Sequence, residues 1–309
     1  MSVEVAAPTT AQLPYFGAPW FLSPRFEELI AERGLAPNDE ARVRSFADHG
    51  YVILDDLGFD DFDGFAARVE SDLAPLHEDG KYNRIMDAWT TSPAVRDLAT
   101  NAQIIEFLEV LYGRKPIPFQ TLNFRRGSQQ PTHSDAYHFH CYPKHFMCGV
   151  WVALEDTDDD NGPVHYYPGS HRLPDYEFLC PGDESDLHAF VEKLIPSYGL
   201  KKELAYLKRG QALVWAANLL HGGEPVVKPD RTRLSQVTHC YFENCSYYTP
   251  FRSDFATGNV FFRQITDVTT GKLHPLRITT GRVRPPLVSR AVTWQRRIGR
   301  AFGRGYVRY

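Results

Sequence analysis

Apolar side chains in the first third of the chain recur at the three- and four-residue spacing of helices. Residues 23–33 show this spacing and predict a short helix. A second helix is expected to begin at a cap formed by Asn38 or Asp39 and to end at Gly50, because these residue types favour those positions. Two longer amphipathic helices and one short strand complete this part, over residues 59–76, 93–112 and 51–54.

After residue 113 the pattern changes to short blocks that are typical of strands. Over 117–154 and 203–243, apolar residues alternate with polar ones or run in short β-rich blocks between turn residues. A helical insert is expected between these groups, at 183–195. Several short strands in succession favour an antiparallel sandwich or barrel. The sequence therefore predicts a mainly β fold with N-terminal helices.

The composition is that of an ordinary globular protein. The chain has 309 residues, of which 43% are hydrophobic and 23% charged, so disordered and coiled-coil classes are excluded. No run approaches the ~18 apolar residues of a membrane-spanning helix, and residues 1–12 lack the pattern of a signal peptide. The five cysteines form no C-x-x-C pair, which favours reduced thiols and a cytoplasmic location.

Charge is distributed unevenly along the chain. Residues 282–309 carry eight arginines and no acidic residue, which leaves 26 basic against 38 acidic residues in the rest. Residues 286–309 are expected to form a basic amphipathic tail that docks on this chain or on a subunit partner, where arginines can pair with acidic groups. Weak peripheral contact with an anionic membrane is the alternative. Nucleic acid is not expected, because no recognised reading motif is present.

The candidate chemistry begins at His133 and Asp135, two residues apart in a segment expected to be β-rich. Side chains at i and i+2 of an extended segment point the same way, so these two can converge on one divalent metal. His221 follows an apolar strand and precedes two glycines, and it is the expected third ligand. Two histidines and one carboxylate leave metal positions open and are typical of non-haem Fe(II) oxygenases.

Other histidines compete for these roles. His171 follows a turn, and His239 lies within a predicted strand, where it would face the same side as Val237 and line the pocket. His77 and Asp79 have the spacing of the metal pair but stand at the end of a helix, where their side chains diverge, so they are interpreted as surface residues. Zinc is the alternative metal, although structural zinc takes four protein ligands and usually sulfur.

The strand predicted after His221 offers a partner for an anion. Arg233 and Ser235 share one of its faces by the two-residue period. Arginine binds a carboxylate through two parallel hydrogen bonds, and a hydroxyl adds a third. 2-Oxoglutarate fits such a partner, because it chelates iron through a 2-oxo acid group and ends in a distal carboxylate. Arg231 stays open as the alternative anchor, because the register is inferred.

Four motifs occur in order along the chain: QPTHSDAYHF, GVWVALEDTDDDNGPVHYYPGSHR, LLHGGEP and RTRLSQVTHCYF. Together they resemble the phytanoyl-CoA hydroxylase family of Fe(II)/2-oxoglutarate dioxygenases, from about Val52 to Phe242. The resemblance implies a double-stranded β-helix (jelly-roll, cupin-like) core with N-terminal helices. The expected organisation is a single oxygenase domain and a tail, with the domain at 1–285, its helical part at about 23–113, its core at about 117–243, and the tail at 286–309.

The resemblance also implies roles for single residues. It implies iron ligands at His133, Asp135 and His221, the co-substrate anchor at the arginine of the following strand, and further co-substrate contacts at Trp151 and Gln120. Gly223 stands where some relatives carry a hydroxyl that contacts the co-substrate. Halogenating relatives replace the aspartate of the motif by a small residue, so the presence of Asp135 favours hydroxylation or another oxidation.

These expectations together describe an oxygenase that acts on a small organic molecule. Its cofactors would be Fe(II), 2-oxoglutarate and O2, and its by-products succinate and CO2. Aromatic residues around the motifs suit a flat or partly apolar substrate. Two other interpretations stay open: a non-catalytic jelly roll that binds a ligand, and an oxygenase that acts on a macromolecule.

Overall fold

The structure is a computed structural model that describes residues 18–77, 84–176, 184–255, 257–278 and 281–282. The expected basic tail lies outside the described residues. No helix in these ranges combines the length and the apolar character that crossing a membrane requires.

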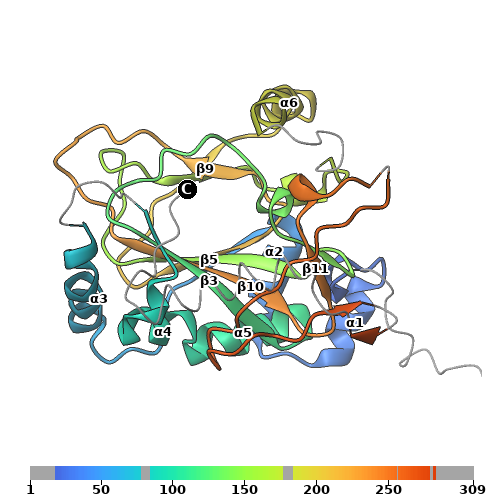
Figure 1. The fold of residues 1–309 in the computed structure, drawn as a ribbon, viewed down its shortest axis with the longest axis horizontal. Helices are drawn as coiled ribbons and strands as arrows, with labels where there is room; N and C mark the ends of the chain where they lie inside the picture. The colour runs from blue at the N-terminus through green and yellow to red at the C-terminus, as the bar shows by residue number, and fades with distance from the viewer. Residues whose placement is uncertain (1–17, 78–83, 177–183, 256, 279–280, 283–309) are drawn as a thin grey trace, which may run out of the picture.

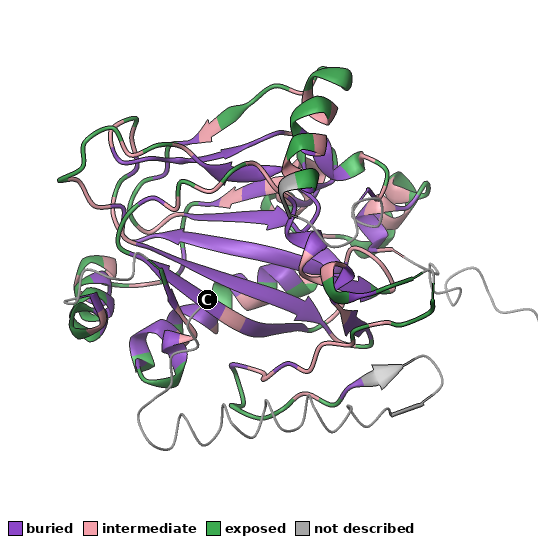
Figure 2. Ribbon diagram, turned by 45° about the horizontal axis from the view of Figure 1, so that its top comes forward, coloured by how far each residue is buried: buried purple, intermediate pink, exposed green. Residues whose placement is uncertain are grey.

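A six-stranded antiparallel sheet forms the centre of the molecule (Figure 1). Its strands follow the order β1-β8-β5-β10-β3-β2, so neighbours in the sheet are far apart in the sequence. Central strands β5 and β10 are buried along their whole length, as Figure 2 shows by colour. The strands span Tyr51–Leu54 (β1), Arg84–Met86 (β2), Pro116–Phe124 (β3), Met147–Ala153 (β5), Ala212–Ala216 (β8) and Ser235–Phe242 (β10).

A smaller sheet faces the larger one across the barrel interior. It has the order β7-β6-β9, and the isolated bridge between His133 and His221 extends it by one position. Shorter pairs complete the β-structure, β4 with β11 and β12 with β13. These strands span Glu203–Ala205 (β7), Val164–Tyr166 (β6), His221–Gly223 (β9), His140–Tyr142 (β4), Ser246–Tyr248 (β11), Arg277–Ile278 (β12) and Gly281–Arg282 (β13). Two facing antiparallel sheets joined in this way form the expected jelly roll, and the predicted fold class is confirmed.

Helices cover the outer face of each sheet, with α3, α4 and α5 below the larger sheet in the view of Figure 1 and α6 above the smaller one. Their apolar faces pack against outward-facing residues of the larger sheet such as Val150 and Val214, which form one core cluster with Phe46 of α2 and Leu108 of α5. The helices span Phe26–Arg33 (α1), Pro37–His49 (α2), Phe62–His77 (α3), Pro93–Ala99 (α4), Ala102–Tyr112 (α5) and Glu184–Ser197 (α6).

Two of the predicted helix boundaries are wrong. Helix α2 begins at Pro37 after Ala36, ahead of the expected caps, because proline suits the first helical turn, where its missing N–H costs nothing. The single helix expected over 93–112 is two helices, since the side chain of Asn101 accepts a hydrogen bond from the N–H of Ile104 and starts α5 anew. The predicted ending of α2 at Gly50 is correct, with that glycine in the left-handed region at φ 82°.

The space between the two sheets holds a second apolar cluster. Trp151, Leu213, Trp215 and Val237 point inward from the larger sheet and meet Val164 of the smaller one. Strand alternation therefore sends one set of side chains to the helices and the other into the barrel. The candidate site is built from this inward set.

Candidate metal centre

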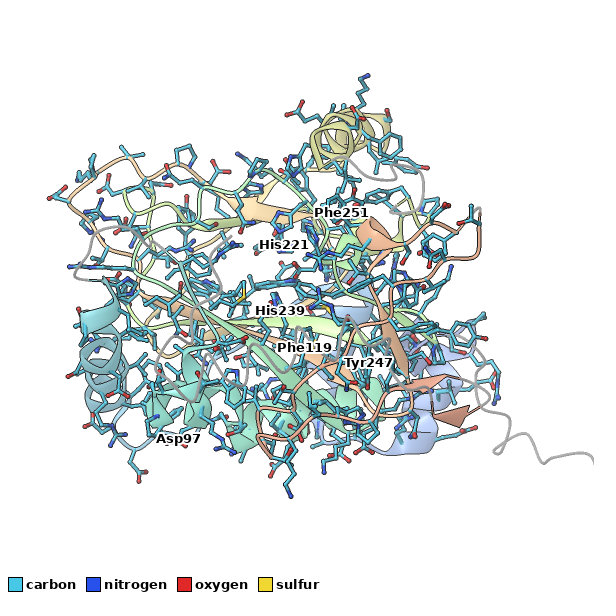
Figure 3. All side chains as sticks on the ribbon, in the orientation of Figure 1. Asp97, Phe119, His221, His239, Tyr247 and Phe251 are labelled. Carbon is cyan, nitrogen blue, oxygen red and sulfur yellow. The ribbon has the colours of Figure 1, made fainter. Side chains whose placement is uncertain are left out.

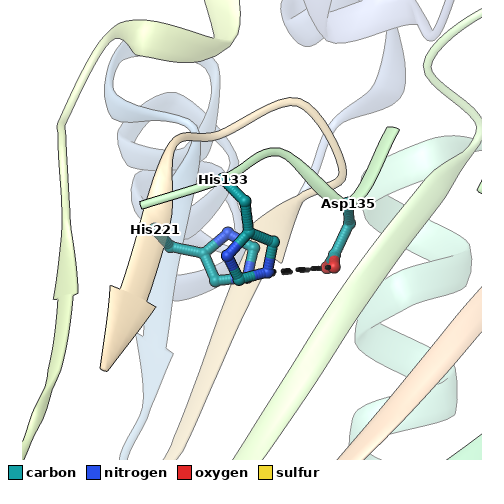
Figure 4. A group of neighbouring side chains, drawn as sticks. All are labelled: His133, Asp135 and His221. Carbon is teal, nitrogen blue, oxygen red and sulfur yellow. Dashed lines mark ion pairs between the residues drawn. The ribbon is translucent and has the colours of Figure 1, made fainter. Parts of the chain in front are cut away.

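A backbone bridge brings His133 and His221 together. The N–H of His133 donates to the carbonyl of His221 at 2.8 Å, and the N–H of His221 donates to the carbonyl of His133 at 3.0 Å. Residues paired in this way across antiparallel strands send their side chains to the same face. The two imidazole rings accordingly lie side by side, with centroids 4.5 Å apart (Figure 4).

Asp135 reaches the same point through an extended residue between it and His133. Ser134 has φ −113° and ψ 130°, and its hydroxyl accepts a hydrogen bond from the N–H of Ala136 at 3.2 Å, so a 3-10 helix begins at Asp135. The segment therefore consists of a single β-bridge at His133 and a helix cap at Ser134, where a longer β-rich segment was expected. One extended residue is enough to keep the two side chains on one side.

The three side chains gather tightly inside the barrel. One ligand-type atom from each of His133, Asp135 and His221 lies within 4.8 Å of the others. The carboxylate oxygens of Asp135 are 3.9 Å from Nε2 of His133 and 3.7 Å from Nε2 of His221. Asp135 is buried, and so is His221. The donor set is thus two imidazoles and one carboxylate in an interior that water reaches poorly.

Hydrogen bonds fix which nitrogen each imidazole presents. Nδ1 of His133 lies 2.8 Å from the carbonyl of Pro131, and Nδ1 of His221 lies 2.9 Å from the carbonyl of Leu219. A carbonyl oxygen only accepts, so each Nδ1 carries the proton and each Nε2 presents a lone pair toward Asp135. Such second hydrogen bonds orient histidines that ligate metals.

Burial keeps these groups in their ligand forms. Desolvation, with the neighbouring His221, lowers the pKa of His133 to about 4, and desolvation also lowers the pKa of His221. Burial by itself would raise the pKa of Asp135, but the imidazoles of His221 and His239 outweigh it and hold that pKa below its ordinary value. Two neutral imidazoles and a carboxylate are the states that bind a divalent cation.

The donor set fits iron better than structural zinc. It has three protein ligands and no cysteine, whereas structural zinc takes four ligands and usually sulfur. Two histidines with one carboxylate are the ligands of non-haem Fe(II) oxygenases. Of the competing histidines, His171 lies against α2, where its Nε2 faces the carbonyl of Ala47 at 3.1 Å. It is not one of the residues of the metal cluster.

His239 does line the interior, on the face expected from alternation. It points toward the centre from β10, opposite His221 of β9 (Figure 3). Its Nε2 lies 3.6 Å from an oxygen of Asp135, and its Nδ1 lies 3.0 Å from the side-chain oxygen of Gln120. Gln120, expected beside the co-substrate, thus contacts His239. Its predicted contact with 2-oxoglutarate stays a prediction.

Arg233 is a buried cation with few partners. Its side chain is 1% exposed, and its Nη1 donates to the carbonyl of Gly162 at 2.9 Å. Its guanidinium carbon lies 5.4 Å from the ring centre of Trp151 and 6.0 Å from that of Phe124. Burial lowers the pKa of Arg233 to about 10, an effect that Glu155 partly opposes, so the group stays charged at neutral pH. No described carboxylate forms an ion pair with it.

Two nitrogen donors beside this cation have no partner among the described residues. They are Nε of Arg233 and Nε1 of Trp151, both buried. Buried donors are nearly always satisfied, so a pair of orphaned donors around a buried positive charge indicates that a ligand completes the site. A carboxylate supplies the acceptors and the charge that are missing. The residues therefore fit the distal carboxylate of 2-oxoglutarate.

The structure separates the two candidate arginines. Arg231 lies at the surface, where its guanidinium pairs with Asp158 at 2.9 Å, while Arg233 points into the barrel. Ser235 is fully buried in β10, and its hydroxyl lies 3.5 Å from the carbonyl of Arg233. Trp151 faces inward from β5 in the apolar cluster between the sheets. The interior thus holds Arg233, Ser235 and Trp151, and it leaves Arg231 outside.

One residue that pattern reading did not single out, Trp215, lies directly against the metal cluster. Nε1 of Trp215 donates to Oδ2 of Asp135 at 2.9 Å, and the Trp215 ring covers Gly149 of the neighbouring strand. Alternation along β8 indicates that Trp215 faces inward. The pairing that places it beside Gly149 depends on the register between strands, which the sequence does not show.

A jelly roll whose interior holds two histidines, a carboxylate and a buried arginine defines the class of non-haem iron oxygenases that use a 2-oxo acid. Comparison with known proteins agrees with this class. Residues 92–233 match the family model of phytanoyl-CoA dioxygenase (PhyH). These matches support the PhyH family of Fe(II)/2-oxoglutarate oxygenases, and the protein is an enzyme of that class. The recognition from the sequence motifs is confirmed.

The relatives differ in how much of their length is matched. Ectoine dioxygenase of Sphingopyxis alaskensis is 26% identical over 226 residues, which cover 63% of this chain and 73% of that protein. Peroxisomal phytanoyl-CoA dioxygenase of Rattus norvegicus is 25% identical over 132 residues, covering 39% of this chain and 38% of the relative. The chain therefore aligns with little more than a third of the peroxisomal enzyme.

Solved structures share the fold. The crystal structure of the ectoine enzyme EctD from S. alaskensis with 2-oxoglutarate and 5-hydroxyectoine has a TM-score of 0.53 at 21% identity, covering 70% of this chain and 79% of that one. The α-ketoglutarate-dependent carbocyclase SnoK from nogalamycin biosynthesis has a TM-score of 0.57 at 17% identity, covering 73% and 91%. These likenesses support the jelly-roll architecture.

Proposed function

We propose that the protein hydroxylates a small organic substrate with Fe(II), 2-oxoglutarate and O2 and releases succinate and CO2. The observation that carries the proposal is the cluster of His133, Asp135 and His221, whose ligand atoms lie within 4.8 Å of one another in a buried interior. The family match supports the reaction class. The residue roles and the substrate class are part of this proposal.

His133, Asp135 and His221 hold the iron. The Nε2 lone pairs face inward because the Nδ1 protons are bound to the carbonyls of Pro131 and Leu219. When bound, iron and 2-oxoglutarate supply the oxidising chemistry, in which decarboxylation of the co-substrate accompanies reduction of O2. The protein contributes a fixed ligand set and a dry interior, which limits side reactions.

Arg233 binds the distal carboxylate of 2-oxoglutarate, with Ser235 and Trp151 beside it. The orphaned Nε atom of Arg233 and Nε1 of Trp151 support this role, since both are buried donors that await an acceptor. A carboxylate held at this point leaves the 2-oxo acid end of the co-substrate free to reach the metal cluster. The charge of Arg233 is thereby neutralised by the ligand.

The substrate is proposed to be a small molecule with an apolar or flat face. The Phe139 ring lies 4.8 Å from the His239 ring, tilted by 42°, and the Phe119 ring lies 5.5 Å from that of Phe139. His138 and Phe251 form a further ring contact at 5.8 Å. Phe139 and Phe119 thus lie on the side of His239, whose Nε2 is 3.6 Å from Asp135, whereas Phe251 lies on the side of His221 (Figure 3). Aromatic walls with a few polar groups are usual in pockets for organic ligands.

Anaerobic binding followed by turnover tests the proposal. The wild-type protein with Fe(II) and 2-oxoglutarate should show the visible charge-transfer absorption of a 2-oxo acid chelated to Fe(II), and His133→Ala should not. Admission of O2 should then yield succinate in wild-type protein. Equal absorption in both proteins would refute the assigned ligands. Wild-type protein that shows no charge-transfer absorption when Fe(II) and 2-oxoglutarate are both present would support the non-catalytic alternative.

The remaining sequence predictions are a single domain over 1–285, a docked tail at 286–309 and a cytoplasmic location. They stay predictions. The alternative of a macromolecular substrate also remains, and it would be favoured if a screen of small organic acids, amines and aromatic compounds gave no substrate-stimulated succinate.

A further inference from the structure

One inward row crosses four neighbouring strands beneath Asp135. Gln120 of β3 pairs with His239 of β10, His239 pairs with Gly149 of β5, and Gly149 pairs with Trp215 of β8. All four positions face the barrel interior. The row therefore places an amide, an imidazole, a gap and an indole side by side under the carboxylate of Asp135.

The gap at Gly149 is required by the indole. A Cβ on Gly149 would lie 2.4 to 2.6 Å from three atoms of the Trp215 ring, which real Cβ atoms do not approach. The ring lies across the glycine backbone and is 3% exposed. Any larger residue at this position displaces the indole from its place beside Asp135.

The indole contacts two members of the metal cluster. Its Nε1 donates to Oδ2 of Asp135 at 2.9 Å, a hydrogen bond to a charged acceptor, and its ring centre lies 4.7 Å from that of His221. The same Oδ2 lies 3.7 Å from Nε2 of His221, while Oδ1 lies 3.9 Å from Nε2 of His133. An indole nitrogen only donates, so this hydrogen bond takes up one lone pair of Oδ2 and fixes the orientation of the Asp135 carboxylate toward the two imidazoles.

We propose that Trp215 is a positioning residue that fixes the orientation of the Asp135 carboxylate as a metal ligand, with Gly149 as the space that admits the ring. This inference rests on the proposed function of His133, Asp135 and His221 as metal ligands. Partners of this kind contribute ~10–100-fold to metal affinity in other sites. Loss of the indole N–H is therefore expected to weaken metal binding by that factor while the fold persists.

The test compares two tryptophans that each donate to an aspartate. Trp215→Phe removes the N–H at Asp135, and Trp89→Phe removes a similar bond from Trp89 to Asp87 at 3.3 Å, remote from the site. Apo-protein is titrated with Co(II) alone by calorimetry, and visible Co(II) absorption reports the ligand field. Trp215→Phe should raise the Kd about 10- to 100-fold and change the absorption. Trp89→Phe should leave both as in wild type.

Other outcomes separate the inference from the proposed function. A Kd for Trp215→Phe within about threefold of wild type, with wild-type absorption, overturns the positioning role while the metal site stands. Wild-type protein that binds no Co(II), or binds it as tightly after His133→Ala, overturns the proposed function itself. A purely structural role would lower the melting temperature of the apo-protein without changing the Kd.

A second variant covers the case in which Trp215→Phe fails to fold. Incorporation of β-(3-benzothienyl)alanine at position 215 keeps the shape of the bicyclic ring and replaces only the N–H by sulfur. The same rise in Kd is expected. An unchanged Kd for this variant would overturn the inference as clearly as the phenylalanine variant would.

Discussion

Two polar regions share the barrel interior, and they are prepared for their ligands in opposite ways. In the metal region (His133, Asp135 and His221), protein hydrogen bonds already fix the groups, through two carbonyls and the indole of Trp215. In the arginine region (Arg233 and Trp151), two buried donors find no partner among the described residues. The first region is organised by the protein itself, whereas the second is proposed to be completed by its ligand.

The difference has an energetic meaning. A fully partnered site costs the folded protein little, while a buried and uncompensated charge destabilises it until an anion arrives. Binding of a carboxylate then gains affinity from relief of that cost. Mutations in the metal region and in the arginine region should therefore have different effects on metal binding, co-substrate binding and stability.

The largest effect is expected from removing a metal ligand. Asp135→Ala or His221→Ala should lower affinity for Fe(II) by more than the ~10–100-fold that loss of an outer partner costs, and turnover to succinate should fall below detection. Metal titration and succinate assays measure this. His49→Ala, at an exposed histidine of α2, is the control and should behave as wild type.

Arg233→Ala should act on the co-substrate and leave the metal bound. Truncating one partner of a buried charge pair costs ~2–5 kcal/mol, so the KM for 2-oxoglutarate should rise ~100-fold at ~1.4 kcal/mol per tenfold. Arg231→Ala is the matched control, since Arg231 pairs with Asp158 at the surface. Kinetics with both variants decide the anchor: a large rise for Arg231→Ala with none for Arg233→Ala would reverse the assignment.

This pair of arginines also shows how far sequence reasoning reaches. Alternation places Arg233 on the face of Ser235, but it leaves Arg231 open, because the start of β10 at Ser235 is set by pairing with β3 and β5. The motifs predicted the jelly roll and the three clustered residues. The contact of Trp215 with Asp135 could not be predicted, since it depends on a cross-strand neighbour at Gly149.

In the helical part, a helix end was predicted correctly where one residue type determines it. It was missed where a capping residue and a continuous apolar pattern favour different structures. Gly50 ends α2 as expected, because a left-handed backbone suits glycine. The break at Asn101 was missed, since the apolar spacing continues across it from α4 into α5. Capping by a single amide outweighed a continuous pattern.

Replacing Arg233 by methionine should stabilise the protein when no ligand is present. Burial lowers the pKa of Arg233 from its ordinary value to about 10, so the charged form is disfavoured in the folded state. Apolar replacement of buried charges gains ~1–4 kcal/mol in other proteins, and ~1–3 kcal/mol is expected in urea unfolding of apo-protein. Added 2-oxoglutarate should stabilise wild type and leave Arg233→Met unchanged. A clearly less stable variant would contradict the cost assigned to this charge.

Acid should lower the free energy of unfolding of the apo-protein, through His133 of the metal region. The pKa of His133 is about 4 when folded and about 6.5 when unfolded. The unfolded state therefore binds more protons between these values, so the stability from neutral His133 is present above pH 6.5 and is lost as pH falls toward 4. Between pH 7 and pH 5 the loss is about 2 kcal/mol.

A difference between two pH values isolates this contribution. His133→Asn should reduce the loss of unfolding free energy between pH 7 and pH 5 by about 2 kcal/mol, because packing effects cancel in the difference. His49→Asn should leave that loss as in wild type. Urea unfolding with a chelator present measures both. An equal pH dependence in His133→Asn and wild type would mean that this imidazole is not neutralised by burial.

The smallest effect is expected from Trp151→Phe, and its character matters more than its size. Phenylalanine keeps an aromatic face beside Arg233, whose guanidinium lies 5.4 Å from the Trp151 ring centre, and it removes only the orphaned Nε1 donor. A hydrogen bond to a charged group contributes ~1.5–3 kcal/mol, and Arg233 still neutralises the carboxylate, so the KM for 2-oxoglutarate should rise about tenfold, at the low end of that range. Trp20→Phe, which removes a hydrogen bond to the carbonyl of Val110, is the control and should leave that KM unchanged.

The Kd for Co(II) should stay at the wild-type value in Trp151→Phe, in contrast to Trp215→Phe. If Trp151→Phe weakened metal binding instead, the two regions would be one coupled network, and the separation between a prepared metal site and a ligand-completed anion site would be wrong.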